Sequence, residues 1–342
     1  MLRLIKYTVL FEIIILFACN ISSLGSNASS INSLEEVNLG GTNQWILMRS
    51  DNLNNPILLF LHGGPGYPEM PYTHFDSPRL EKHFIVVNWD QRGAGKSFND
   101  SVDVNTLNLE QFLSDTHELI QFLRKRFSKD KLFLIGQSWG TILGLYTAER
   151  YPELIHAYIG MGQVVNSTEG ETLSYQYTLE KAKEGADSEA VAALENIGPP
   201  PYSGGFGSLA AQRQYLTKYG GAMINITYPD LMKIMSQSPH YTKIDKQNFM
   251  KAFIQTNSIM WNEVMEVNFS ETLNEIRVPV YFFTGKYDFV TPFEIVERFF
   301  AKLKAPNKKM IWFDNSGHWP NLDEPEKYQD ELIKIVRNVM EK

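Results

Sequence analysis

The sequence has little cysteine and no excess of positive charge. One cysteine occurs in 342 residues, so neither an intrachain disulfide nor a cluster of thiolate ligands for zinc can form. Lys and Arg number 32 against 39 Asp and Glu, and the net charge of −7 argues against nucleic-acid binding as the main function. The fold must therefore be held by packing, for which 43% hydrophobic residues supply a large core.

The N-terminal apolar run is also short. Residues 7–17 fall below the about 20 residues that a transmembrane helix needs. The run follows Arg3 and Lys6 and ends at Cys19, before a Ser/Asn-rich stretch, an order typical of an export signal. Residues 1–19 resemble a bacterial lipoprotein signal, in which Cys19 is lipidated and residues 20–36 form a tether.

This N-terminal pattern predicts an exported protein. Its only membrane contact would be a lipid anchor on the outer face of the bacterial cytoplasmic membrane. A cytoplasmic protein with an unmodified Cys19 is the alternative.

Beyond residue 37, short apolar runs alternate with stretches of helical spacing. The runs over residues 56–61, 84–89 and 131–136 are typical of strands buried on both faces, and residues 39–48 read as an edge hairpin. Strands separated by helices predict an α/β fold with a mostly parallel sheet and helices on both faces. We assign this core to residues 37–162 and 277–342. Residues 163–276 lack the alternation and predict a mainly helical cap at the sheet edge where such proteins bind ligands.

The segment Gly136-Gln-Ser-Trp-Gly140 lies between a predicted strand and a predicted helix. A G-x-S-x-G string in that position places the serine on a sharp turn, with its hydroxyl above the sheet edge. The glycines let the backbone pass without Cβ clashes, and the helix N-terminus faces any negative charge that develops nearby. The pattern predicts that Ser138 is a nucleophile, whereas an aspartate would be expected there in dehalogenases and epoxide hydrolases.

A serine nucleophile needs a base and a group that orients the base. His318 follows the last predicted strand, and Asp288 follows the strand that ends near Phe283, so both reach the sheet edge of Ser138. The chain order Ser138, Asp288, His318 is that of the α/β-hydrolases. These three residues are the predicted catalytic triad.

An oxyanion hole is predicted beside this triad. His62-Gly-Gly-Pro-Gly66 follows a predicted strand, and its glycines let a backbone N–H turn into the site. The N–H groups of Gly64 and Trp139 are the expected pair. The loop lacks the spacing of a nucleotide-binding G-x-x-x-x-G-K-[ST] or G-x-G-x-x-G string, which argues against a phosphate cradle.

Five segments together resemble the proline iminopeptidase (prolyl aminopeptidase) family of α/β-hydrolases. They are His62-Gly-Gly-Pro-Gly66, Trp89-Asp-Gln-Arg-Gly-Ala-Gly-Lys-Ser97, Gly136-Gln-Ser-Trp-Gly140, Gly285-Lys-Tyr-Asp288 and Gly317-His318. The resemblance extends from about residue 37 to the C-terminus. It implies a serine hydrolase that releases an N-terminal residue, often proline, from small peptides without a metal or other cofactor. It also implies a structural role for Asp90 and Arg92, which would lock the loop beside the oxyanion hole.

The cap departs from this family. The Trp-rich stretch at its start and the Glu-Asn-His-Tyr-Phe-like segment, which carry the amine-binding glutamates in family members, do not occur here. Glu171 and Glu263 remain as possible ligands for a substrate amine, and Trp261 as part of an apolar wall. The expected substrate is therefore a small peptide, with a carboxylesterase or lactonase on small acyl substrates as the alternative. A non-enzymatic receptor is disfavoured because every triad position is filled.

Overall fold

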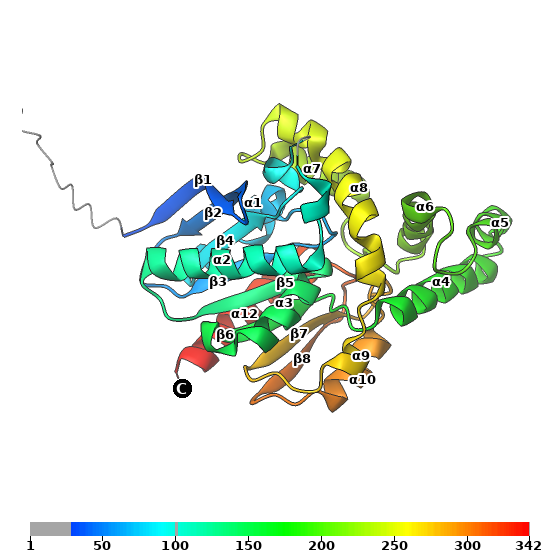
Figure 1. The fold of residues 1–342 in the computed structure, drawn as a ribbon. Coiled ribbons are helices and arrows are strands. Elements are labelled where there is room, and N and C mark those ends of the chain that lie inside the picture. The colour runs from blue at the N-terminus through cyan, green and yellow to red at the C-terminus, as the bar shows by residue number, and fades with distance from the viewer. Residues whose placement is uncertain (1–28, 100–101, 342) are drawn as a thin grey trace, which may run out of the picture.

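The computed structural model describes residues 29–99 and 102–341. The predicted signal over residues 1–19, Cys19 and the first part of the predicted tether lie outside these residues. Within them the chain forms one eight-stranded sheet in the order β1-β2-β4-β3-β5-β6-β7-β8, flanked by helices (Figure 1). The strands are β1 (Ile31–Leu39), β2 (Thr42–Ser50), β3 (Ile57–Leu61), β4 (Ile85–Asp90), β5 (Leu132–Gln137), β6 (Ile155–Met161), β7 (Val280–Gly285) and β8 (Lys308–Phe313).

The sheet is parallel from β4 to β8 and antiparallel at its first edge. β3 pairs in parallel with both β4 and β5, and the parallel pairing continues through β6 and β7 to β8. β1 and β2 form an antiparallel hairpin, and β2 joins it to β4. The predicted α/β fold with a mostly parallel sheet is confirmed. Because parallel strands end at the same edge, the loops after β3, β5, β7 and β8 lie together.

The edge hairpin is longer than the sequence predicts. The turn lies at Gly40 and Gly41, both with positive φ, but β1 already begins at Ile31. Residues 31–36 are therefore strand, and the prediction that the tether extends to residue 36 is wrong. Only Val37 and Leu39 of β1 are buried, so the strand is held mainly by backbone pairing to β2, which its largely polar sequence does not reveal.

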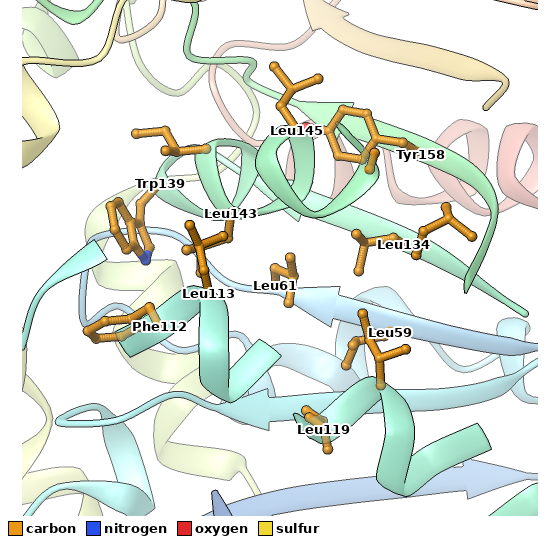
Figure 2. Close-up of a cluster of buried hydrophobic side chains, with 14 of the residues drawn as sticks. Leu59, Leu61, Phe112, Leu113, Leu119, Leu134, Trp139, Leu143, Leu145 and Tyr158 are labelled. Atoms are coloured by element: carbon orange, nitrogen blue, oxygen red, sulfur yellow. The ribbon is translucent and has the colours of Figure 1, made fainter. Parts of the chain in front are cut away.

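Two apolar layers enclose the sheet. One face is covered by α2 (Leu109–Phe127), α3 (Trp139–Arg150) and α10 (Phe293–Lys302), and the other by α12 (Pro325–Met340). Figure 2 shows how α2 and α3 pack on the first face. The buried side chains there include Leu59, Leu61, Phe112, Leu113, Leu119, Leu134, Trp139, Leu143, Leu145 and Tyr158.

The connection from β6 to β7 is the segment for which a helical cap is predicted. It contains α4 (Ser167–Glu184), α5 (Ser188–Ile197), α6 (Gly205–Lys218), α7 (Tyr228–Gln237), α8 (Lys243–Met265) and α9 (Phe269–Thr272). In Figure 1, α4, α5 and α6 lie to one side of the sheet, α7 lies at its upper end, and α8 runs down between the sheet and the other cap helices. The short helices α1 (Thr73–Asp76) and α11 (Pro320–Asp323) lie in the loops after β3 and β8. In the part of the chain that the structure describes, no helix is long and apolar enough to cross a bilayer.

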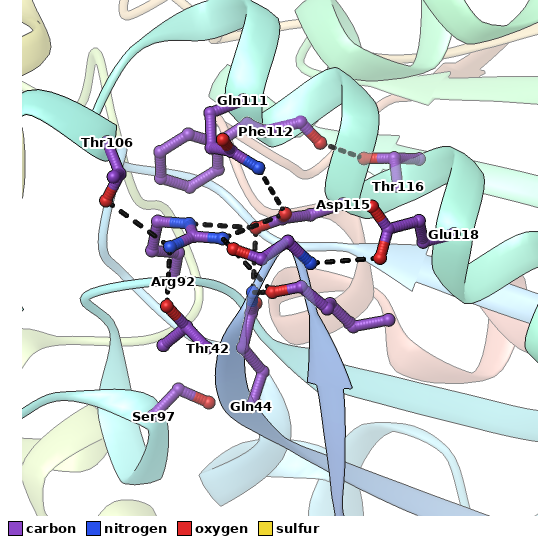
Figure 3. Close-up of polar contacts among 12 residues, drawn as sticks. Thr42, Gln44, Arg92, Ser97, Thr106, Gln111, Phe112, Asp115, Thr116 and Glu118 are labelled. Carbon is purple, nitrogen blue, oxygen red and sulfur yellow. Dashed lines mark hydrogen bonds and ion pairs between the residues drawn. The ribbon is translucent and has the colours of Figure 1, made fainter.

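A buried ion pair fastens the hairpin, the β4 loop and α2 together (Figure 3). Arg92 donates from Nε and Nη2 to the two carboxylate oxygens of Asp115, each at 2.9 Å, and the two side chains are 1% and 0% exposed. Asp115 also accepts from Gln44 at 2.7 Å and from Gln111 at 2.8 Å. The other guanidinium donors reach Leu39 O, Gly40 O, Thr42 Oγ1 and Thr106 Oγ1. Every charge in this cluster is thus compensated.

We expect Asp115→Ala to lower the free energy of unfolding by about 3–5 kcal/mol, because it leaves the Arg92 guanidinium buried and unpaired. Glu110→Ala is the matched control, since Glu110 is on the same helix and pairs with Arg150 at the surface. Its loss should cost at most about 1 kcal/mol. Urea denaturation of both variants measures the difference, and equal losses would contradict a dominant role for the buried pair.

Candidate active site

Ser138 lies on a sharp turn between β5 and α3. Its φ of +51° and ψ of −118° are outside the helical and extended regions, a strained backbone typical of functional residues. The flanking glycines are required by close packing: a Cβ on Gly136 would lie 2.3 Å from Gly140 O, and one on Gly140 would lie 1.9 Å from Leu61 O. The turn is thereby pressed against the end of β3, where the glycine-rich loop begins.

Asp288 and His318 are brought together from the loops after β7 and β8. The distance from His318 Nδ1 to Asp288 Oδ2 is 2.9 Å, and both residues are almost fully buried. Asp288 Oδ1 also accepts from the N–H groups of Val290 and Thr291, and Oδ2 from Thr291 Oγ1. Because an ionised carboxylate only accepts, His318 carries its proton on Nδ1, which leaves Nε2 free to act as a base.

Gly162 contacts the imidazole from the loop after β6. It has a φ of +57°, and a Cβ at this position would lie 2.6 Å from His318 Cε1 and 2.8 Å from Nδ1. Any side chain would therefore push the ring away from Asp288. Gly162 is not among the site residues that the sequence predicts, because its only signal is a glycine directly after a buried strand.

The glycine-rich loop after β3 is tied to the serine turn through Gln91. The Gln91 N–H donates to His62 Nε2 at 3.1 Å, and its side chain donates to His62 O and accepts from Trp139 Nε1. Burial lowers the pKa of His62 to about 4, so the ring is neutral. Its Nδ1–H then donates to Gly63 O at 2.9 Å. Thus Gln91, rather than Asp90 or Arg92, is the residue that contacts the loop of the predicted oxyanion hole.

Gly64 and Trp139 line the same cavity as Ser138 and His318. Trp139 is the first residue of α3, so its N–H has no helical partner and remains free to bind an anion. Gly64 has a φ of +111°, and a Cβ there would lie 2.5 Å from Gly66 N. Only glycine fits this position, as expected for a backbone that turns toward a ligand.

The last residue of β4, Asp90, and the loop after it bind the cap. Asp90 is fully buried, and one of its oxygens accepts from Tyr241 Oη in the cap and from Lys96 N. Burial raises the pKa of Asp90 to about 7, although these two hydrogen bonds oppose the rise. Thr256 Oγ1 on α8 donates to Gly93 O at 2.8 Å. The cap helix α8 is therefore fixed directly over the glycine-rich loop.

A cavity of about 620 Å³ lies between the sheet edge and the cap, and α4, α6, α7 and α8 contribute half of its lining residues. This size suits a small organic or peptide ligand. Apolar side chains predominate in the cap wall, among them Phe206, Leu209, Leu231, Phe253, Trp261 and Val264. Among residues 29–99 and 102–341, no group of three His, Cys, Asp or Glu side chains is arranged to hold a metal ion.

Of the three cap residues predicted to bind substrate, Glu171 and Trp261 line this cavity and Glu263 does not. Glu171 is 6% exposed and pairs through Oε1 with Arg213, while its Oε2 has no hydrogen-bond partner. Glu263 Oε2 instead accepts from Leu109 N at 2.6 Å. It caps the N-terminus of α2, where a carboxylate is favoured by the helix dipole, so its prediction as an amine ligand is wrong.

Comparisons with known proteins agree with this geometry. The family described as the alpha/beta hydrolase fold matches residues 56–325. The probable aminopeptidase YbaC of Bacillus subtilis (strain 168) is 32% identical over 310 residues, which cover 90% of this chain and 98% of that protein. A proline iminopeptidase of Clostridioides difficile (strain 630) is 27% identical over 291 residues, which cover 82% of this chain and 87% of that protein.

The solved structures include proteins of the same fold. The crystal structure of a proline iminopeptidase from Mycobacterium smegmatis has a TM-score of 0.64 at 18% identity and covers 90% of this chain and 98% of that chain. At that identity the likeness concerns the fold alone. With the sequence relatives, it confirms the resemblance that the five segments predict.

Proposed function

The chain belongs to the alpha/beta hydrolase family, and we propose that it is a serine hydrolase with Ser138 as nucleophile, His318 as base and Asp288 as the group that orients the base. The observation that carries this proposal is the 2.9 Å contact between His318 Nδ1 and Asp288 Oδ2 beside the cavity that Ser138 lines. Ser138 and His318 line the same cavity, so a substrate bound there would contact both the nucleophile and a base whose Nδ1 is already held by Asp288.

The proposed reaction passes through an acyl-enzyme. Ser138 Oγ attacks the carbonyl carbon of the substrate while His318 Nε2 takes the hydroxyl proton, and Asp288 stabilises the imidazolium. The N–H groups of Gly64 and Trp139 would bind the developing oxyanion, a contribution that typically amounts to a few kcal/mol per donor. The imidazolium then protonates the leaving amine or alcohol. In the second half of the reaction, His318 takes a proton from a water molecule that attacks the acyl carbon, and returns it to Ser138 Oγ as the acid is released.

We further propose that the substrate is a small peptide or amide with a free N-terminal amine, as in the relatives named aminopeptidase and proline iminopeptidase. Glu171 supports this substrate class, because its Oε2 is a buried acceptor without a partner on the same cavity. A substrate ammonium would supply the missing donor. The cavity is otherwise mostly apolar, so it would enclose the side chain of the residue that is released.

A carboxylesterase or lactonase is the second candidate, and one observation favours it. Arg213 pairs with Glu171, so the two charged side chains of the cap wall compensate each other and a cationic substrate gains less from the site. An uncharged acyl group would need only the apolar wall around Trp261. The two candidates share the triad and differ at Glu171.

The nucleophile can be tested independently of the substrate. We expect Ser138→Ala to abolish labelling by a fluorophosphonate and to lower kcat on any turned-over substrate by at least about 10³-fold. Ser167→Ala is the matched control, since Ser167 lines the same cavity and its hydroxyl also has no partner. Mass spectrometry that located the label on Ser167, or full labelling of Ser138→Ala, would overturn the assignment.

The substrate class can be tested with one pair of compounds. If the enzyme is an aminopeptidase, a chromogenic proline amide with a free amine should be cleaved, and its N-acetylated form should lose at least about tenfold in kcat/KM. Glu171→Gln should lower kcat/KM for the free-amine compound by about 10- to 100-fold, because it removes the charge that faces the ammonium.

Glu263→Gln is the control for this substitution, because a glutamine oxygen can still cap α2 and the residue lies outside the cavity. Its kcat/KM should equal that of the wild type. Equal rates on the free and acetylated amides, with no effect of Glu171→Gln, would reject the aminopeptidase and leave the esterase.

A further inference from the structure

One cap segment reaches down to both loops that carry the acid–base pair. It comprises residues 221–225, between α6 and α7. Gly221 O accepts from the N–H of Phe289, the neighbour of Asp288, at 2.9 Å, and Ala222 O accepts from the N–H of His318 at 2.7 Å. The backbone of the base is thus hydrogen-bonded to the cap rather than to the sheet.

Asp323 fastens this segment to the loop of His318. Its Oδ1 accepts from the N–H groups of Ile224 and Asn225 at 3.2 and 2.8 Å. Its Oδ2 accepts from Gly317 N at 2.9 Å and from Ser316 Oγ at 3.2 Å. Asp323 is only 6% exposed. One of its carboxylate oxygens therefore binds the cap segment and the other binds the His318 loop, each through two hydrogen bonds. Charge-assisted bonds of this kind are stronger than neutral ones.

The two segments fit closely where Asp323 joins them. A Cβ on Gly317 would lie 2.2 Å from Ala222 O, so a side chain there would force the segments apart. Asn225 adds two more contacts, since its Nδ2 donates to Asn315 O at 2.8 Å and to Asp323 O at 3.1 Å. The position of the His318 backbone is therefore set by how residues 221–225 are docked.

We propose that Asp323 is a positioning residue that couples the cap to the base. While its carboxylate holds residues 221–225 against the loop, His318 is kept in the geometry needed to take the Ser138 proton. When the cap segment is released, the base is displaced even though Asp288 and Ser138 are unchanged. This inference rests on the proposed function, in which His318 activates Ser138.

A positioning role differs from a purely structural one in what a substitution changes. Catalytic groups must be held within about 0.5 Å of their working geometry, so a small displacement of His318 lowers the rate of chemistry without unfolding the protein. Loss of Asp323 should then lower kcat and nucleophile reactivity, with little change in KM. A structural role alone would lower the thermal midpoint and the amount of active protein, with the rate per folded molecule unchanged.

The test is the second-order rate of fluorophosphonate labelling per folded molecule, measured together with kcat and KM on the best substrate. Asp323→Asn replaces one acceptor oxygen by an NH2 group, which only donates and cannot accept from these N–H groups. We expect its labelling rate and kcat to fall by about 10- to 100-fold, with KM within about threefold of the wild type. Asn225→Ala, at an exposed position, should lower both rates by a few fold.

Asp314→Asn is the matched control, because Asp314 precedes His318 in the same loop but its carboxylate is 62% exposed and faces surface lysines. Its rates should equal those of the wild type. The inference would be overturned if folded Asp323→Asn had the labelling rate and kcat of the wild type. If Asp323→Asn does not fold, the same result in Asn225→Ala would overturn it. In both cases the proposed function would still stand. Failure of the wild type to be labelled at all would overturn both.

Discussion

Three consecutive side chains at the C-terminal end of β4 hold the active-site loops, and the rest of the site depends on them. Asp90 binds Tyr241 of the cap, Gln91 binds both His62 and Trp139, and Arg92 forms the buried pair with Asp115. All three residues are essentially inaccessible to solvent, so each must find its partners within the protein. These partners fix the arrangement of the loop, which connects the cap, the glycine-rich loop and the outer hairpin.

These contacts explain how the glycine-rich loop after β3 can hold a fixed conformation in the site. Three of the five residues in the segment His62-Gly-Gly-Pro-Gly66 after β3 are glycines, which alone would leave the backbone free to move. Gln91 removes that freedom from one side, because it binds His62 and the indole of Trp139 at once. The α8 helix removes it from the other, since a Cβ on Gly66 would already touch Thr256. Gly64 and Trp139, which come from separate segments, are thus held on one cavity, where the proposed oxyanion hole needs them.

The fold and the contact between Asp288 and His318 could be predicted because their signals are local. A strand, a G-x-S-x-G turn and a helix adjoin in sequence, and parallel topology then places the loops with Asp288 and His318 at the same edge. The remaining features depend on contacts between distant segments. The neighbouring residues in the sequence do not reveal three such contacts: Glu263 caps α2, Gly162 contacts His318, and Asp323 binds the cap. The full length of β1 cannot be predicted for a different reason, since an edge strand with a polar sequence shows little hydrophobic alternation.

In the proposed mechanism, Ser138, Gly64 and Trp139 converge on one reacting carbonyl. A crystal structure of the enzyme after reaction with the diphenyl phosphonate of proline tests it most directly, because attack by a nucleophile displaces phenoxide and leaves a tetrahedral phosphorus in place of the carbon. We expect phosphorus bonded to Ser138 Oγ, with the phosphonyl oxygen about 2.7–3.1 Å from the amide nitrogens of both Gly64 and Trp139. Phosphorus on another atom, or a phosphonyl oxygen that points away from both amides, would contradict it.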